Sequence, residues 1–397
     1  MKIIPSLRIL LVSIVCLALS SLGQSPLLIP LEFHNFGKTD AKWFHPGLAV
    51  LPDGSWLVTV QEVHGGDFFG NPHFTFSKDK GVSWTEPAEI EGLKAQPFQD
   101  TSYQIGVSDI RPFVSPHDGT AFVFGGTTVY SPKGNVAWQQ GKKPVFPPQQ
   151  AVYVTWRSET GWSPRKVLPL PGFEGNYRTS CTQIAFVENN EVLIPIYLEH
   201  GRTKFEGFDS PRYCAVVGRY RQVGETLEFI SRSDFIDIPT GRGALEPSII
   251  RLPDGNYALT IRAEDGHGYV CLSPNGTTWL EKVAWHWEDG TPLTMSSTQQ
   301  HWLRVGHKTY LVYTRDDGSN TKIFRFRAPL YMAEAKPSQG ILLAKTEQVV
   351  FPRQQVDGKE VWYGNFHCTQ LTDRTGLIID CTGGTRLYKV KAAVAVP

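Results

Sequence analysis

Residues 77–84 read Ser-Lys-Asp-Lys-Gly-Val-Ser-Trp, and this stretch decides the fold prediction. In such a pattern the Asp79 carboxylate and the Ser77 hydroxyl satisfy backbone donors of a tight hairpin, and Gly81 adopts a positive φ. Trp84 then covers the adjoining apolar surface. Two further copies are present, a shortened one at residues 273–279 and a remnant at residues 158–162. Repeated hairpins of this kind predict a repeated β-sheet unit.

A longer module recurs around these hairpins. It has a polar opening, a strand, a turn often written Pro-Asp-Gly, a second strand and outer strands, and its best copies are residues 45–60 and 246–262. The six openings fall at His45, Asp109, Cys181, Glu246, Gln299 and Asn365, spaced by 64, 72, 65, 53 and 66 residues. Because each four-stranded sheet must bury both faces against its neighbours, periods of this size predict an all-β, six-bladed propeller. Residues 27–36 are expected to close the ring by pairing into the last unit.

The composition and the N-terminus define the broad class of the protein. The chain has 397 residues, 41% of them hydrophobic and 19% charged, which excludes disordered, collagen-like and coiled-coil classes. Only residues 9–22 are apolar enough to interact with a membrane. Basic residues precede this stretch, and it ends in small residues. We therefore predict a secretory signal peptide at 1–23, no membrane span after its removal, and a single propeller domain at 24–397. A secreted or periplasmic monomer is expected.

Charge and motif content exclude several kinds of partner. Loss of Lys2 and Arg8 with the signal peptide leaves 37 basic against 38 acidic residues, so nothing electrostatic favours nucleic acid. No glycine-rich loop follows a strand and opens a helix, so nucleotide chemistry has no candidate. No metal site and no cofactor are predicted, because neither HExxH nor Cys-x-x-Cys spacing occurs among His45, His64, His73, His301 and His367.

The cysteines suggest one disulfide. Five remain after residue 23: Cys181, Cys214, Cys271, Cys368 and Cys381. A turn centred on Arg374 and Thr375 would place Cys368 directly opposite Cys381, at a distance that a disulfide can span. Two buried thiols are the alternative interpretation. The pairing of the other three cysteines stays open.

The stretch 77–84 fits the Asp-box pattern Ser-x-Asp-x-Gly-x-Ser/Thr-Trp. With its six units, the sequence resembles the sialidase (neuraminidase) superfamily of six-bladed propellers, including the sialidase-like BNR-repeat proteins of bacteria. The resemblance covers nearly the whole chain after residue 23. It implies a site on the propeller axis with three arginines for a sugar carboxylate, a tyrosine nucleophile activated by glutamate, and an aspartate acid/base.

The resemblance extends to individual residues. The run Glu-Pro-Ser-Ile-Ile that begins at Glu246, continued to Arg262, is similar to the strand pair that carries the activating glutamate and the second arginine. Arg327 is similar to the third arginine, with Arg315 as a rival. Asp67 lies in the loop where the acid/base aspartate of the family is found.

Two positions depart from the family pattern. Where the first arginine is expected, the chain reads Trp43-Phe44-His45-Pro46, and where the nucleophilic tyrosine is expected it has Asn365. Tyr363 lies two residues earlier on the same strand face, so a local shift in register would restore the nucleophile. The pocket is expected to suit an anionic or polar glycan. Its expected members are His45, Asp67, Asp109, Arg111, Glu246, Arg262, Gln299, Arg327 and His367.

The predicted function is that of a secreted glycoside hydrolase of exo-α-sialidase type, which acts on the terminal residue of an acidic or modified glycan. A polysaccharide lyase acting on uronic-acid glycans would need only a group that neutralises the carboxylate and a base such as His45 or His367, and this fits the missing tyrosine. A non-catalytic glycan-binding propeller would keep the fold alone. Arginine and glutamate inside a propeller can also serve as ion pairs between blades. The sugar, the linkage and the stereochemical outcome stay open.

Overall fold

The computed structural model describes residues 25–397 except residues 34, 39, 100, 138–144, 206, 296 and 385–388. The predicted signal peptide at 1–23 lies outside the described residues. Within the described part of the chain, no helix is both long and apolar enough to cross a membrane.

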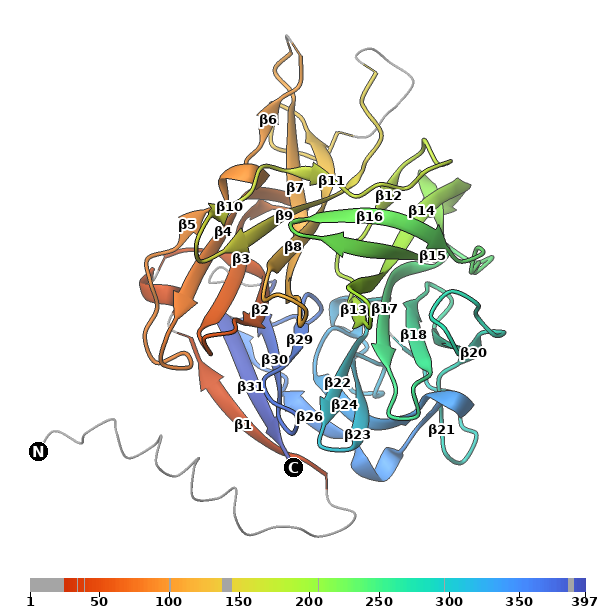
Figure 1. Ribbon diagram of the computed structural model, residues 1–397. Coiled ribbons are helices and arrows are strands. Elements are labelled where there is room, and N and C mark those ends of the chain that lie inside the picture. Colours follow the sequence, from red (N-terminus) through yellow and green to blue (C-terminus); the bar gives the residue numbers. More distant parts are fainter. Residues whose placement is uncertain are drawn as a thin grey trace, which may run out of the picture.

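Six largely antiparallel sheets surround a common axis, which confirms the all-β, six-bladed propeller (Figure 1). Blade 1 contains β2 (Trp43–Val50), β3 (Trp56–Gly65), β4 (Phe68–Ser77) and β5 (Ala88–Glu89). Blade 2 contains β7 (Gln104–Val114), β8 (Ala121–Tyr130), β9 (Ala151–Arg157), β10 (Gly161–Trp162) and β11 (Lys166–Val167), with β6 (Gln96–Pro97) beside β7. Blade 3 contains β12 (Tyr177–Arg178), β13 (Ala185–Val187), β14 (Glu191–Phe205), β15 (Phe208–Val223) and β16 (Thr226–Arg232).

The second half of the ring repeats this plan. Blade 4 contains β17 (Leu245–Arg251), β18 (Tyr257–Arg262), β19 (Gly268–Ser273) and β20 (Val283–Ala284). Blade 5 contains β22 (His301–Val305), β23 (Lys308–Tyr313) and β24 (Leu330–Lys336), with β21 (His286–Trp287), β25 (Ile341–Leu342) and β26 (Gln348–Phe351) outside them. Blade 6 contains β29 (His367–Gln370), β30 (Gly376–Cys381), β31 (Val390–Val396) and β1 (Leu27–Glu32). A small hairpin, β27 (Gln355–Val356) and β28 (Lys359–Glu360), and the short 3-10 turns η1 (Asn35–Gly37), η2 (Glu91–Leu93), η3 (Phe324–Phe326), η4 (Pro337–Gln339) and η5 (Ala344–Thr346) complete the described elements.

The two ends of the described chain meet in blade 6. Strand β1 pairs with β31 in an antiparallel register from Leu27 opposite Val396 to Glu32 opposite Lys391. The predicted closure of the ring is therefore confirmed, with the pairing confined to residues 27–32. Because the last blade contains both the first and the last strand, its hydrogen bonds hold the ring closed.

The predicted turns join the first and second strands of the blades. In blade 1 the Ser55 N–H donates to Asp53 Oδ1 (2.9 Å), and Gly54 has φ 82°. The equivalent turn of blade 4 repeats this geometry, with the Asn256 N–H donating to Asp254 Oδ1 (3.0 Å). The Pro-Asp-Gly motif is thus read correctly as an inner hairpin in both places.

The stretch 77–84 connects β4 to β5 and forms the expected polar turn. Asp79 Oδ1 accepts hydrogen bonds from the Ser77 hydroxyl and the Ser83 N–H, both at 2.8 Å. The Gly81 N–H donates to Ser77 Oγ (2.7 Å), and Gly81 has φ 91°. Hydrogen bonds from Ser83 are the main cause that lowers the pKa of Asp79 to about 2. The motif fastens the outer edge of the blade, far along the sheet from the axis.

The tryptophan of this motif connects the first and last blades. The Trp84 ring lies 4.9 Å from the rings of both Phe33 and Phe36, in edge-to-face contact. Blade 4 contains the second copy, in which Asn275 Oδ1 accepts the Thr278 N–H at 2.8 Å. The asparagine therefore replaces the aspartate without loss of the turn.

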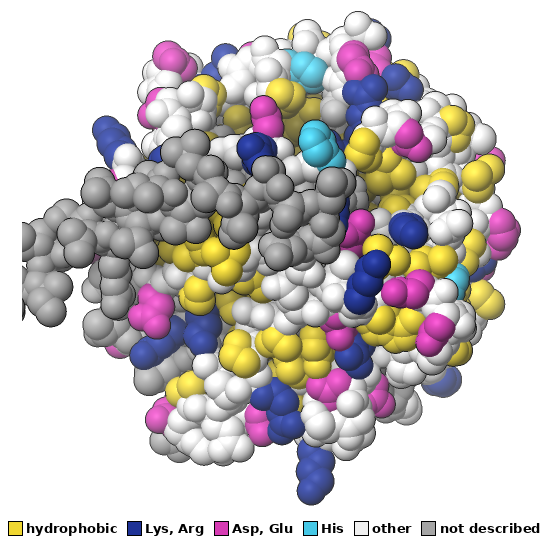
Figure 2. Space-filling view, turned by 90° about the horizontal axis from the view of Figure 1, so that it is seen from below, with side chains coloured by type: hydrophobic (Ala, Val, Ile, Leu, Met, Phe, Trp, Pro, Cys, Tyr) yellow, Lys and Arg dark blue, Asp and Glu magenta, His cyan; other side chains and the backbone are white. Residues whose placement is uncertain are grey.

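Hydrophobic clusters fill the interfaces between neighbouring blades. One cluster joins blades 5 and 6 through residues such as Val312 and Ile378, and another joins blades 2 and 3 through residues such as Phe124 and Ile196. On the face shown in Figure 2, acidic and basic side chains are interspersed, as expected for a chain with a formal charge of +1. The apolar side chains thus hold the blades together and leave the axis for polar groups.

The predicted disulfide is wrong. Cys368 lies opposite Ile378, three residues before Cys381, and both cysteines are free and buried. The β29–β30 turn is centred earlier than predicted, because the Leu371 N–H donates to the Thr375 carbonyl (2.9 Å) and closes a five-residue loop. An odd shift in register moves a side chain to the other face of the sheet. The two thiols therefore lie in the core instead of in a bond.

Reduction should leave the stability of the protein unchanged. Because Cys181, Cys214, Cys271, Cys368 and Cys381 are all free, dithiothreitol has no bond to break among the described residues. We expect the same midpoint of thermal unfolding with and without the reductant, measured by circular dichroism. A lower midpoint under reducing conditions would contradict the register of β29 and β30.

Candidate functional site

Four blades begin with a residue in the left-handed region of the backbone. These residues are His45 (φ 47°), Asp109 (φ 58°), Cys181 (φ 57°) and Glu246 (φ 45°). The register of the inner strands is interrupted at His45, Asp109 and Glu246, for example between Ser108 and Arg111, and Cys181 lies in the turn between β12 and β13. Each such non-glycine residue costs about 1 to 3 kcal/mol, and strain of this kind gathers at functional sites. Three of the predicted unit openings are therefore β-bulges, and the opening at Cys181 is a left-handed residue in a turn.

A buried arginine holds these bulges in place. The fully buried guanidinium of Arg111 donates to the backbone carbonyl of Ile110 at 2.8 Å and to that of Asn365 at 3.2 Å. It also lies 3.4 Å from the carbonyl of His45 and 3.7 Å from Cys181 Sγ. One cation thus connects blades 1, 2, 3 and 6. The sequence placed Arg111 in the substrate pocket, whereas its contacts are to the protein itself.

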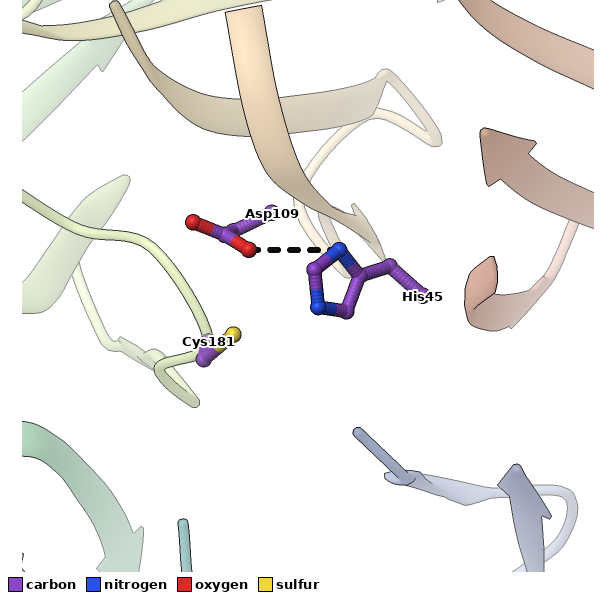
Figure 3. A group of neighbouring side chains, drawn as sticks. All are labelled: His45, Asp109 and Cys181. Atoms are coloured by element: carbon purple, nitrogen blue, oxygen red, sulfur yellow. Dashed lines mark ion pairs between the residues drawn. The ribbon is translucent and has the colours of Figure 1, made fainter. Parts of the chain in front are cut away.

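His45 is a neutral histidine in contact with an acid. Its Nδ1 lies 3.2 Å from Asp109 Oδ1, and its Nε2 lies 3.0 Å from Asn365 Oδ1 (Figure 3). Burial, followed by the charge of Arg111, lowers the pKa of His45 to about 3. At neutral pH the contact with Asp109 therefore joins a neutral ring to a carboxylate and is not a pair of opposite charges.

A second cation lies on the other side of Asp109. Arg178 of β12 donates to Thr128 Oγ1 (2.8 Å) and lies 3.8 Å from Asp109 Oδ2. Burial acts against its charge, but Asp109 and the neighbouring tyrosines together raise the pKa of Arg178. Two of these tyrosines, Tyr197 and Tyr213, pack edge to face with ring centres 5.4 Å apart. The result is a cationic position lined by aromatic rings.

Blade 4 supplies an ion pair next to these groups. The guanidinium of Arg262 donates to Glu246 Oε1 (2.6 Å) and to the Ser297 hydroxyl (3.2 Å). The prediction that Glu246 and Arg262 lie side by side on the innermost strands of blade 4 is confirmed. The Glu246 side chain is 17% exposed and that of Asp109 is 19% exposed, so solvent reaches both carboxylates.

Arg327 approaches the same region from blade 5. Burial, and then the charges of Arg262 and Arg325, lower the pKa of Arg327. Among the described residues Arg327 forms no ion pair. Gly364 permits its approach, because a Cβ at that position would lie 2.8 Å from Arg327 Cδ. A half-buried cation that lies near another cation and forms no ion pair is suited to bind an anionic ligand.

The other predicted residues occupy different places. Asp67 is exposed in the β3–β4 turn and lies close enough to His45 to influence its charge. Gln299 donates to the Phe366 carbonyl (2.5 Å) and helps to hold the axis. Arg315 forms a bidentate pair with Glu347 (2.9 and 2.8 Å), within blade 5.

The predicted tyrosine and the second histidine point into the core. The Tyr363 hydroxyl donates to the Pro352 carbonyl (3.2 Å), and its ring belongs to the cluster between blades 5 and 6. His367 is fully buried, and its Nδ1 accepts the Leu48 N–H (3.4 Å). Burial, followed by the charge of Arg111, lowers the pKa of His367 well below its usual range. No shift in register brings Tyr363 to the site.

Three site residues escaped the sequence analysis. The sequence places Cys181 at the opening of the third unit, but it was not among the expected members of the pocket. Arg178 precedes that opening, and Tyr197 belongs to the second strand of the same blade. Counting every blade opening as a candidate axial residue would have identified Cys181. No sequence pattern marks Arg178 or Tyr197.

The comparisons with known proteins support the fold. No protein-family model matches the chain, and neither does any curated protein. A protein of unknown function from Dyadobacter fermentans is 13% identical with a TM-score of 0.64, over 93% of this chain and 99% of the other. The NanB sialidase of Streptococcus pneumoniae (13% identity, TM-score 0.60, 94% of this chain and 71% of the other) and the intramolecular trans-sialidase of Ruminococcus gnavus (13%, 0.58, 91% and 96%) are also similar. At these identities the likeness shows a sialidase-like propeller fold and no more.

Replacing Arg111 by methionine should destabilise the ring. The change leaves several buried carbonyls without a donor, and we expect a loss of roughly 2 to 5 kcal/mol in the free energy of unfolding, measured with urea. Arg353→Met is the matched control, because Arg353 pairs with Glu360 (3.2 Å) at the surface and should cost about 1 kcal/mol or less. Equal losses of unfolding free energy in the two variants would show that the axial hydrogen bonds of Arg111 contribute no more to stability than a surface ion pair.

Asp380 should make stability depend on pH. This β30 carboxyl is fully buried, its Oδ2 has no hydrogen-bond partner among the described residues, and burial raises its pKa to about 7. A raised pKa favours the protonated folded state, so its contribution is complete below about pH 4 and is lost as the pH rises to about 7. The slope is at most about 1.4 kcal/mol per pH unit.

Asp380→Asn should remove this slope. The stability of the parent protein relative to the variant should fall between about pH 4 and pH 7 in urea titrations. A difference that stays constant over this range would contradict a buried, protonated Asp380.

Proposed function

We propose that the protein is a glycan-active enzyme, a sialidase-like glycoside hydrolase that acts on the terminal residue of an acidic or modified glycan. The observation that carries this proposal is Arg327, a half-buried cation whose charge acts on that of Arg262 and which forms no ion pair among the described residues. A carboxylated sugar would supply the missing negative charge. The likeness to sialidase structures supports the proposal at the level of the fold.

The neighbouring groups fit roles in binding and proton transfer. Arg262 would share the sugar carboxylate with Arg327. Glu246 and the exposed Asp67 are the groups that would move protons during glycoside cleavage. The secreted or periplasmic location and the monomeric state belong to the same proposal.

A lyase is the second candidate, and one observation favours it. Tyr363 donates to the Pro352 carbonyl, so it offers no hydroxyl to a sugar at the axis. Elimination from a uronic-acid glycan needs no glycosyl-enzyme nucleophile, only charge neutralisation and a base. The arginine pair would neutralise the uronate. His45 is the candidate base, although burial lowers its pKa to about 3 and so makes it a weak one.

One experiment separates these functions. The purified protein is incubated with sialylated, uronic-acid and sulfated glycans, and the products are identified by mass spectrometry. A released terminal sugar with water added indicates a hydrolase, whereas an unsaturated uronate that absorbs ultraviolet light indicates a lyase. Binding without any product indicates a glycan-binding propeller and would overturn the enzymatic proposal.

The arginines and the acids should affect different kinetic constants. Arg327→Met should raise KM for the acidic glycan by about tenfold or more with a smaller change in kcat, because the substrate carboxylate loses a partner in a desolvated site. Glu246→Gln should lower kcat by about a hundredfold or more, the usual effect of losing a proton-transfer group.

Arg353→Met is the control for both changes, since Arg353 lies at the surface and pairs with Glu360. It should leave both kinetic constants unchanged. Full activity in Glu246→Gln together with Asp67→Asn would show that the catalytic groups lie elsewhere.

A further inference from the structure

Three residues with different metal-binding atoms meet at the axis. His45, Asp109 and Cys181 open three successive blades, and each offers one donor atom within 4.8 Å of the other two. Figure 3 shows their side chains pointing toward a common space. The three residues lie 64 and 72 residues apart in the sequence, so no local sequence motif marks the cluster.

The hydrogen bonds of His45 leave one ring nitrogen without a partner. Its Nε2–H donates to Asn365 Oδ1 (3.0 Å), which makes Nδ1 the unprotonated nitrogen of the neutral ring. That Nδ1 is buried, has no hydrogen-bond partner among the described residues, and lies 3.2 Å from Asp109 Oδ1. Two acceptors facing each other repel unless a cation lies between them.

We propose that His45 Nδ1, a carboxylate oxygen of Asp109 and Cys181 Sγ bind a divalent transition metal ion of the zinc class. Nitrogen, oxygen and thiolate ligands together are the donor set that zinc accepts. Ligands at about 2.0 to 2.2 Å from a tetrahedral ion lie roughly 3.3 Å from each other, close to the separation of Nδ1 and Oδ1.

Neighbouring residues hold the donor atoms of such a site in place. Asn365 fixes the histidine ring in the tautomer that presents Nδ1, which is a common feature of metal-bound histidine. All three ligands have left-handed backbone conformations, which position the donor atoms before the metal binds.

The nearby charges are balanced. Arg111 lies 3.7 Å from Cys181 Sγ and Arg178 lies 3.8 Å from Asp109 Oδ2, so each cation faces a ligand that carries negative charge when the metal is bound. The carboxylates of Asp67 and Glu246 are close enough to influence the charge of His45. Burial raises the pKa of the Cys181 thiol, and the charge of Arg111 acts in the opposite direction.

This site goes beyond the proposed glycan chemistry. Three protein ligands leave a fourth position for a water molecule or a substrate oxygen, the coordination found in catalytic zinc sites. The metal would lie beside Arg178 and the solvent-reached carboxylate of Asp109, where the substrate is expected.

Cobalt provides a direct test. The purified protein is treated with a chelator, dialysed and titrated with Co²⁺ alone, and the ultraviolet and visible spectra are recorded. We expect one Co²⁺ per chain, a thiolate-to-cobalt charge-transfer band in the near ultraviolet, and displacement of the cobalt by Zn²⁺. The readout does not depend on activity, so it stays informative even if the glycan proposal fails.

Variants identify the ligands. Cys181→Ser should abolish the charge-transfer band, and Asn365→Leu should weaken Co²⁺ binding by about 10- to 100-fold because it releases the histidine ring. Cys271→Ser is the matched control, since Cys271 is a buried thiol on β19, and it should leave the band unchanged.

X-ray absorption of the Zn²⁺-loaded parent protein covers the case in which a variant does not fold. One sulfur ligand together with nitrogen and oxygen ligands supports the site. No stoichiometric binding, a zinc ion without sulfur, or a charge-transfer band that survives in Cys181→Ser would overturn the proposal.

Discussion

The hydrogen bonds of the Arg111 guanidinium are the interactions on which the rest of the structure depends. A charge removed from water needs hydrogen-bond acceptors, and this one donates to backbone carbonyls from different blades. The carbonyls of His45 and Ile110 belong to a bulge residue or its neighbour. The guanidinium therefore fixes the irregular backbone at the axis, while apolar packing fixes the regular sheets around it.

The outer hairpins stabilise the blades, whereas the strained residues at the inner edge position side chains at the axis. At the outer edge, the turn of Asp79 and its copy at Asn275 satisfy their own polar groups and stabilise the blades. At the inner edge, His45, Asp109, Cys181 and Glu246 adopt left-handed backbone conformations that cost free energy. Because the outer edge and the interfaces are well packed, the inner edge can hold side chains in positions that suit chemistry better than stability.

The axial groups fall into two sets. Arg262 and Arg327, from blades 4 and 5, provide positive charge next to Glu246. His45, Asp109 and Cys181, from blades 1 to 3, provide a neutral ring, a carboxylate and a thiol. A shared fold does not determine which chemistry such a site performs, and the position of Tyr363 in the core shows that this chain differs from the family pattern at the nucleophile.

The sequence by itself determined the ring. The Pro-Asp-Gly turns, the stretch 77–84 and the six openings predicted six blades, and four of the openings adopt left-handed backbone conformations. Glu246 and Arg262 were predicted as neighbours because both lie in one hairpin.

Tertiary structure alone decided the remaining contacts at the axis. The partners of Arg111, the pairing of Arg315 with Glu347 and the meeting of His45, Asp109 and Cys181 join residues from strands far apart in the chain. Local patterns report hydrogen bonds within a hairpin, whereas contacts across the axis depend on how the blades close into a ring.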